Sequence, residues 1–154
     1  MNNKEKPLPD FLAIYERYQS LTPGQRAELR RCAKPEELSE VPAFYRLVSK
    51  ESSIYGQRQF VFCLPLLTHK SDGPSLGQAL GKQAGLSEKR MMMVLRSEAP
   101  NDLLQLRRLL AMCKPSVDIA KAGKTIFFWS ETSKRKLIED YFFNQTSGTA
   151  QQSA

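Results

Sequence analysis

Residues that could carry out a chemical reaction are few in this chain. The sequence contains one histidine, His69, which precedes a lysine and a turn, and no serine or cysteine motif accompanies it. General-base catalysis needs a nucleophile or a second acid within hydrogen-bond reach of the imidazole. A surface or helix-capping role for His69 is therefore favoured, and we expect the protein not to be an enzyme.

The cysteines and the acidic residues also lack the spacing of a metal site. Cys32, Cys63 and Cys113 lie far apart among apolar or helical residues, and free cysteine is one of the most buried residue types. The acidic segment 36–40 has no histidine or aspartate suited to join it in a metal site, so a solvated face or a partner contact is the simpler interpretation. We predict buried reduced thiols, no metal and no cofactor.

Gly77 and Gly81 do not form a phosphate-binding loop. No Gly-Lys-Ser/Thr ending follows them and no strand precedes them. At an i, i+4 spacing they instead allow another helix to approach closely, either within this chain or from a second copy. Met93 falls outside the apolar arc of its predicted helix, so we expect it to be exposed or to contact a second surface.

Positive charge is the dominant chemical feature of the sequence. Twenty-three Lys and Arg residues oppose 16 Asp and Glu residues, and residues 82–124 alone carry a net charge of +5 out of a total of +7. Clustered positive charge favours a polyanionic partner, although it also serves solubility or the binding of acidic proteins. The predicted nucleic-acid-binding residues are Arg30, Arg31, Lys89, Arg90, Arg96, Arg107, Arg108, Lys124, Lys134, Arg135 and Lys136.

Helical geometry predicts where these side chains point. Arg108 lies opposite a leucine stripe and Arg107 lies on its flank, so both are expected to be exposed and to contribute little to stability. Lys89, Arg90 and the cluster 134–136 fall in first turns of predicted helices, where the helix dipole disfavours cations. For the cluster 134–136 a solvated face stays an alternative, because i, i+4 pairs with acids partly neutralise it.

Helical periodicity runs through most of the chain and predicts an all-α bundle of about eight to nine helices. Phe11, Ile14 and Tyr18 form one face of a first helix capped by Asp10, and residues 22–25 form a capping box for the second. Segment 54–67 is rich in aromatic and branched residues; a strand is the alternative, but a buried helix that ends at Pro65 is favoured. Further helices are expected over 35–40, 42–49, 75–85, 88–97, 100–114, 117–129 and 134–143.

The domain organisation follows from length and from one break. Residues 1–145 are predicted to form a single all-helical domain, with the turn at 71–74 dividing it into lobes 8–70 and 75–145. The small polar segment 146–154 is predicted to be a disordered tail. No apolar run approaches the length of a membrane span and no signal segment is apparent, so a cytoplasmic protein without membrane contact is expected.

Several short strings occur in a defined order along the chain. The strongest is Pro35-Glu36-Glu37-Leu38 followed by Val41-Pro42-Ala43-Phe44-Tyr45-Arg46-Leu47-Val48. Val61-Phe62-Cys63-Leu64, Ser75-Leu76-Gly77-Gln78-Ala79-Leu80, Leu104-Gln105-Leu106-Arg107-Arg108-Leu109-Leu110 and Leu137-Ile138-Glu139-Asp140-Tyr141 follow in the same order. Each string alone is weak, whereas the ordered set from Phe11 to Phe143 is specific. In this order the strings resemble the CasB family, the small subunit of the type I-E CRISPR effector complex Cascade.

The resemblance implies a non-enzymatic helical subunit, present as two copies, that packs on the crRNA-bearing backbone subunits near the large subunit. It implies a role in stabilising the R-loop formed by guide RNA and target DNA, through contacts to the target strand and to the displaced non-target strand. Arg90, Arg96, Arg107 and Arg108 match basic positions of the family, and Arg31 and Lys124 match them less securely.

Two departures and two alternatives accompany the resemblance. The segment between Leu64 and Ser75 is shorter than in the family, and the last basic cluster falls a few residues later. The residues alone also permit a free-standing helix-turn-helix-like DNA-binding regulator, or a helical adaptor for acidic proteins. Sparse Asn and Gln on the face of Arg107 and Arg108 disfavour base reading.

Overall fold

The computed structural model describes residues 6–145, which are mostly helical as predicted. The predicted disordered tail 146–154 lies outside the described residues. The α-helices are α1 (Phe11–Gln19), α2 (Pro23–Arg31), α3 (Pro42–Tyr45), α4 (Ile54–Cys63), α5 (Leu76–Gly81), α6 (Glu88–Arg96), α7 (Asn101–Cys113), α8 (Ile119–Phe127) and α9 (Glu131–Phe143). Two 3-10 helices, η2 (Pro35–Glu40) and η3 (Leu64–Leu66), and two short strands, β1 (Thr68–His69) and β2 (Ser116–Val117), complete the described chain.

Most of the predicted helix starts are confirmed by their caps. The Asp10 side chain accepts from the Ala13 N–H, and Thr22 and Ser75 form capping boxes with Gln25 and Gln78. Such caps satisfy backbone donors that have no partner inside the helix. These local interactions explain why the starts of α1, α2 and α5 were predictable.

The segment 54–67 is a buried helix and not a strand. Helix α4 ends at Cys63, and η3 continues through Pro65 before the chain becomes extended at Leu67. The short helix predicted over 35–40 is confirmed and is a 3-10 helix, whereas the one predicted over 42–49 is helical only to Tyr45. Short segments without a side-chain cap form these tighter or shorter turns more readily than full α-helices.

Sequence reasoning missed the two strands. They pair in parallel, with Thr68 opposite Ser116 and His69 opposite Val117. Strand β1 follows α4 and η3, and β2 follows α7, so their pairing connects the two halves of the chain. Strand β1 lies in the segment between Leu64 and Ser75, which is shorter than in the family that the sequence resembles. A two-residue strand carries too little periodicity to be recognised in a sequence.

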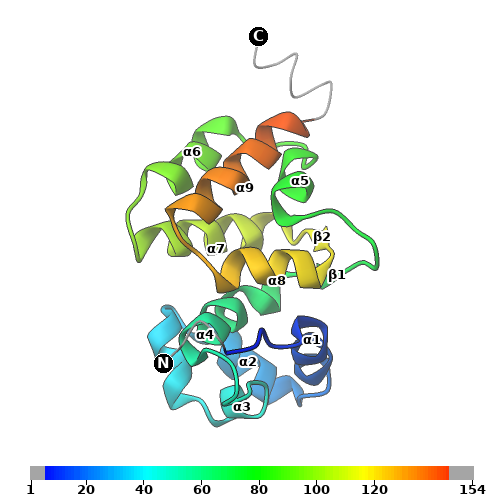
Figure 1. Cartoon of the computed structure of the whole chain (residues 1–154), viewed down its shortest axis with the longest axis vertical. Helices are drawn as coiled ribbons and strands as arrows, with labels where there is room; N and C mark the ends of the chain where they lie inside the picture. The colour runs from blue at the N-terminus through cyan, green and yellow to red at the C-terminus, as the bar shows by residue number, and fades with distance from the viewer. Residues whose placement is uncertain (1–5, 146–154) are drawn as a thin grey trace.

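Helices α1–α4 lie at one end of the molecule and α5, α6 and α9 at the other, with α7 and α8 between them (Figure 1). Helix α8 packs on α1 and α4, and the Phe11 ring contacts Phe60 and Phe127 with centroid separations of 5.1 and 5.7 Å. Gln59 Nε2 donates to the carbonyls of Ile126 and Phe127, which holds α4 against the end of α8. The buried apolar residues form one cluster, and the division into lobes stays a prediction.

Close helix packing at Gly77 and Gly81 occurs within this chain. A Cβ at Gly77 would lie 2.6 Å from Asp140 Cβ and 2.7 Å from the Leu137 carbonyl oxygen, and one at Gly81 would collide with the Tyr141 carbonyl oxygen. Both neighbours are parts of α9, and α5 packs directly on α9. The absence of side chains at these positions therefore sets the distance between the two helices.

We predict that Gly81→Leu lowers the free energy of unfolding by about 1–3 kcal/mol, because the backbone of α9 cannot move aside as a flexible side chain can. Gly24→Leu is the matched control, since a Cβ there meets only the Thr22 hydroxyl oxygen at 4.0 Å. Chemical denaturation of both variants measures the difference. Equal stabilities would contradict the packing argument.

Candidate nucleic-acid interface

Three of the predicted arginines meet in one groove. Arg30 from α2 and Arg107 and Arg108 from α7 line a depression of about 390 Å³. Its apolar floor contains Ala33, Phe62, Leu66, Leu104 and Ala111. We call this depression the arginine groove; its floor residues could not be recognised from the sequence, because they come from segments that only the fold brings together.

Arg107 holds the groove together. Its guanidinium donates from Nε to the Phe62 carbonyl at 2.9 Å, from Nη1 to the Cys32 carbonyl at 2.7 Å and from Nη2 to the Arg30 carbonyl at 3.0 Å. The guanidinium carbon also lies 4.3 Å from the centroid of the Phe62 ring. These carbonyls lie at the C-terminal ends of α2 and α4, where helices carry unpaired acceptors and partial negative charge. One side chain of α7 therefore caps two helices of the other half of the chain.

The expectation that Arg107 is exposed is wrong, and its contacts instead predict a contribution to stability. Its side chain is half-buried, and burial lowers the pKa of its guanidinium, although Cys63, Cys32, Glu37 and Tyr18 act in the opposite direction. Arginine nevertheless stays protonated in proteins. Its donors are largely taken by backbone carbonyls, so Arg107 can contribute positive potential to the groove but few new hydrogen bonds.

The other arginines near the groove are free to bind. Arg30, Arg31 and Arg108 are exposed. Arg90 of α6 is also exposed, and its Nη1 lies 3.4 Å from the sulfur of Met112, one helical turn beyond Arg108 on α7. The structure thus brings residues from α2, α6 and α7 to one region of the surface.

The remaining predicted basic residues lie on other surfaces of the described chain or away from the groove lining. Lys89 and Arg96 are exposed on α6, and Lys124 is exposed on α8. Arg135 and Lys136 are exposed on α9, and Lys136 pairs with Asp140 at 3.1 Å as its i, i+4 spacing predicted. None of these five side chains lines the arginine groove.

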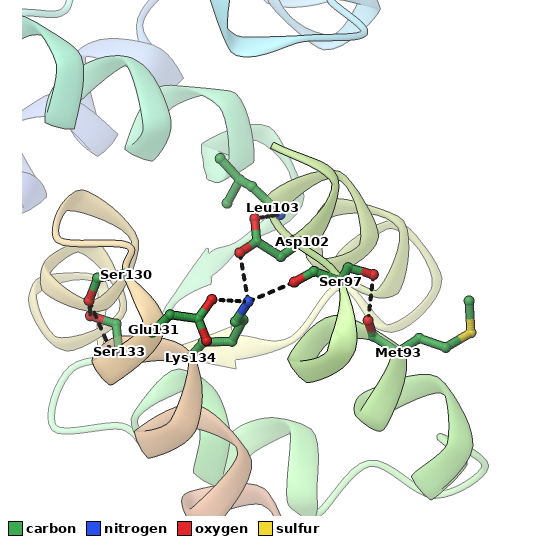
Figure 2. A network of polar contacts seen from close by, with 8 residues as sticks. All are labelled: Met93, Ser97, Asp102, Leu103, Ser130, Glu131, Ser133 and Lys134. Carbon is green, nitrogen blue, oxygen red and sulfur yellow. Dashed lines mark hydrogen bonds and ion pairs between the residues drawn. The ribbon is translucent and has the colours of Figure 1, made fainter. Parts of the chain in front are cut away.

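Lys134 is the clearest difference from expectation. Helix α9 begins at Glu131 with Ser130 as its cap, so Lys134 lies beyond the first turn and points inward. Its side chain is 0% exposed, and Nζ contacts Asp102 at 2.9 Å, Glu131 at 2.8 Å and the Ser97 carbonyl at 2.7 Å. Figure 2 shows the three contacts converging on the ammonium group. Because all its donors are used, Lys134 is not available to a phosphate.

The surroundings of Lys134 keep it charged. Burial acts to lower its pKa, but hydrogen bonds to Glu131 and Asp102 and the charges of both acids outweigh burial, so the pKa is raised. Asp102 is itself buried, and its second oxygen accepts from the Leu103 N–H at 2.7 Å. This ion pair joins the first turn of α7 to α9 and to the end of α6.

His69 and the cysteines behave largely as predicted. His69 Nδ1 accepts from the Ile119 N–H at 3.2 Å, which caps the start of α8. Cys32 and Cys63 are buried, and burial raises the pKa of the Cys63 thiol to about 12; Cys113 is only half-buried. Within residues 6–145, no group of three His, Cys, Asp or Glu residues could hold a metal ion. None of the helices in that range is long and apolar enough to cross a membrane.

Comparison with known proteins decides between the alternatives. Residues 25–142 match the family model of the CRISPR-associated protein Cse2. The chain belongs to the Cse2 family. It is 33% identical to the Cascade subunit CasB of Escherichia coli K12, across 86% of this chain and 92% of that protein. A chain in the crystal structure of E. coli Cascade bound to a PAM-containing double-stranded DNA target superimposes with a TM-score of 0.85 and 31% identity, over 94% of this chain and 99% of that chain.

Membership of the Cse2 family confirms the resemblance drawn from the ordered strings. The matched family is that of a CRISPR-associated protein and not of an enzyme, and the E. coli relative is a subunit of Cascade. The structure places the strings in η2, α3, α4, η3, α5, α7 and α9, and each string supplies buried core residues. The arginine groove is thus a surface of a Cse2 protein.

We predict that Arg107→Ala lowers the free energy of unfolding of this Cse2 protein by about 2–4 kcal/mol, because three carbonyls and the Phe62 ring lose a charged partner. Arg108→Ala is the matched control: it removes the neighbouring exposed arginine and should stay within about 0.5 kcal/mol of the parent. Denaturant unfolding measures both. A small effect at Arg107 would mean that the carbonyls find water equally well.

We also predict that Lys134→Ala costs about 3–5 kcal/mol, since it leaves Asp102 buried without its partner. Lys136→Ala should change stability by no more than about 0.5 kcal/mol, because its side chain is 69% exposed. A folded-state pKa above the ordinary value means that the contribution of Lys134 is complete below pH 10.5 and is lost as the pH rises through the raised pKa. Denaturant unfolding of the parent and of Lys134→Ala is compared at neutral and at strongly alkaline pH. The difference in stability should be large at neutral pH and smaller at alkaline pH.

Proposed function

We propose that this protein stabilises the R-loop of a type I-E Cascade complex by sequence-independent contacts to the phosphates of the target strand and the displaced non-target strand. The observation that carries the proposal is that exposed Arg30 and Arg108 line one groove whose third arginine, Arg107, is already fixed by the fold. Arg31 is also exposed next to Arg30 in the sequence, and Arg90 contacts Met112 one helical turn beyond Arg108. Exchange of a DNA duplex for an RNA–DNA heteroduplex is close to balanced in energy, so protein contacts to the backbone can tip it.

The proposed partners are the backbone and large subunits of Cascade, a second copy of this protein and the R-loop itself. Support comes from the E. coli relative, whose name places it in Cascade and whose fold occurs in a complex with double-stranded target DNA. Lys89, Arg96, Lys124, Arg135 and Lys136 are exposed and remain candidates for further strand contacts. A cytoplasmic location of the protein is also part of this proposal. Purification from its own operon, together with crRNA and larger Cas proteins, would test the assembly.

The groove supports backbone binding better than base reading by a regulator. A recognition helix needs side chains that reach base edges with free donors. Arg107 instead donates its hydrogen bonds to backbone carbonyls at the ends of α2 and α4. Arginines such as Arg30 and Arg108, around an apolar floor, offer charge without a fixed base pattern.

The salt dependence of DNA binding tests the proposal. Four phosphate contacts to a single strand should give a slope of log K against log salt of roughly −3, because each neutralised phosphate releases about 0.7 counterions. Arg108→Ala should flatten that slope by about 0.7 and shorten the lifetime of the R-loop in assembled Cascade. Lys114→Ala, at an exposed lysine beyond the end of α7, is a control for net charge.

Arg108→Ala is a cleaner test than the removal of both neighbouring arginines, because loss of Arg107 would also weaken the fold. Binding is measured by filter retention over a salt series, and R-loop lifetime by competitor challenge. An Arg108→Ala protein that keeps the parent slope would mean that nucleic acid lies elsewhere, along Arg135 and Lys136 or along α8.

A further inference from the structure

A second depression adjoins the arginine groove and differs from it in chemistry. It encloses about 270 Å³ between η2, α4, the turn before α7 and the start of α9. Arg58 of this depression and Phe62 of the arginine groove lie one turn apart on α4, about 6 Å along the helix axis. On α7, Leu103 lines this depression and the next residue, Leu104, lines the arginine groove. We call the second depression the aromatic pocket.

The walls of the aromatic pocket suit a flat ring. Tyr55 and Trp129 line it together with Pro35 and Pro100, and the Tyr55 side chain is 66% exposed although it lies on a helix whose other face is in the core. Nucleic-acid bases stack on such rings whatever their identity. A volume of this size takes one ring system and not a drug-sized ligand.

The pocket also contains donors that lack acceptors. Trp129 Nε1 and Arg58 Nε are two of the three buried side-chain polar atoms that have no hydrogen-bond partner within residues 6–145. Leaving such a donor unpaired costs free energy. Both atoms are closed off from solvent in this structure, so an acceptor in the pocket would reach them once the side chains rotate.

Two carboxylates that line the aromatic pocket limit the charge of the ligand that it can bind. Glu36 is exposed, and Glu131 is 64% exposed while it contacts Lys134. Their charge disfavours a phosphate or a carboxylate in the pocket, and Arg58 disfavours a cation. A neutral planar group with both acceptors and donors avoids both penalties. Nucleobases have this combination, with ring nitrogens and carbonyl oxygens beside exocyclic amino groups.

We propose that the aromatic pocket binds an unpaired nucleobase, extruded from a strand whose phosphates lie on the arginine groove. The inference rests on the proposed function, because it takes the groove as the path of the sugar–phosphate backbone. It assigns Tyr55 to stacking, and Arg58 and Trp129 to donation toward acceptors on the base edge.

The chain contains a single tryptophan, so fluorescence reports on this pocket alone. The full-length protein is titrated at low salt with a short single-stranded DNA, and with an abasic DNA of the same length and number of phosphates. Binding is followed by the anisotropy of a label on the DNA and occupancy of the pocket by quenching of Trp129. We expect both DNAs to bind with similar salt slopes, but only the DNA with bases to quench Trp129, and to bind about fivefold or more tightly.

Tyr55→Ala should reduce the affinity for the DNA with bases by about fivefold and leave the affinity for the abasic DNA unchanged. Tyr45→Ala is the matched control, because Tyr45 is also an exposed tyrosine, at 55%, and lies outside the pocket. Thermal unfolding confirms that both variants are folded.

The outcomes separate this proposal from the proposed function. Equal affinity and equal quenching by the two DNAs would overturn the base site and leave the arginine groove intact, whereas binding of neither DNA would overturn both. If Tyr55→Ala reduced incorporation into Cascade without changing DNA binding, the pocket would hold a protein side chain and the base site would be wrong.

Discussion

The contact between the Arg107 guanidinium and three backbone carbonyls is the interaction on which the arrangement of the two halves depends. It comes from α7 and ends at α2 and α4, so it fixes the C-terminal half of the chain against the N-terminal half. The same contact helps to build the candidate binding surface, because it holds α7, which carries Arg108, against the end of α2, which carries Arg30. Arg107 thus supports the fold, while Arg30 and Arg108 beside it stay exposed.

A buried ion pair fixes the start of α7 to neighbouring helices, as Arg107 fixes its later part. Lys134 on α9 meets Asp102 in the first turn of α7 and the carbonyl of Ser97 after α6. Removing two charges from water costs free energy, so a buried ion pair is stable only when its hydrogen bonds are complete. The three donors of Lys134 all have acceptors. Close contact of α5 with α9 through Gly77 and Gly81 then anchors α9 along its length.

These constraints have a consequence for function. A surface that holds a strand without reading its sequence needs positive charge at defined places and side chains that do not collapse onto one another. Arg107 is held by backbone carbonyls and Lys134 is buried, so neither offers a free cation at the surface. Arg30, Arg31, Arg90 and Arg108 stay exposed on helices. The aromatic pocket adds a neutral, ring-lined site beside that charge, which is the combination found in single-strand binding surfaces.

Local chemistry in the sequence determined the helical fold, most helix starts, the close packing at Gly77 and Gly81 and the family, because caps, periodicity and ordered strings act over a few residues. Tertiary structure decided which cations stay exposed and which support the fold. Arg107 and Arg108 are adjacent and chemically identical, yet only Arg107 faces the carbonyl ends of helices that lie far away in the sequence. Lys134 looked like part of a basic surface because the partner that buries it, Asp102, comes from another helix. The sequence contains the charges, but burial and hydrogen-bond partners are properties of three-dimensional contact, and they determine what each charge does.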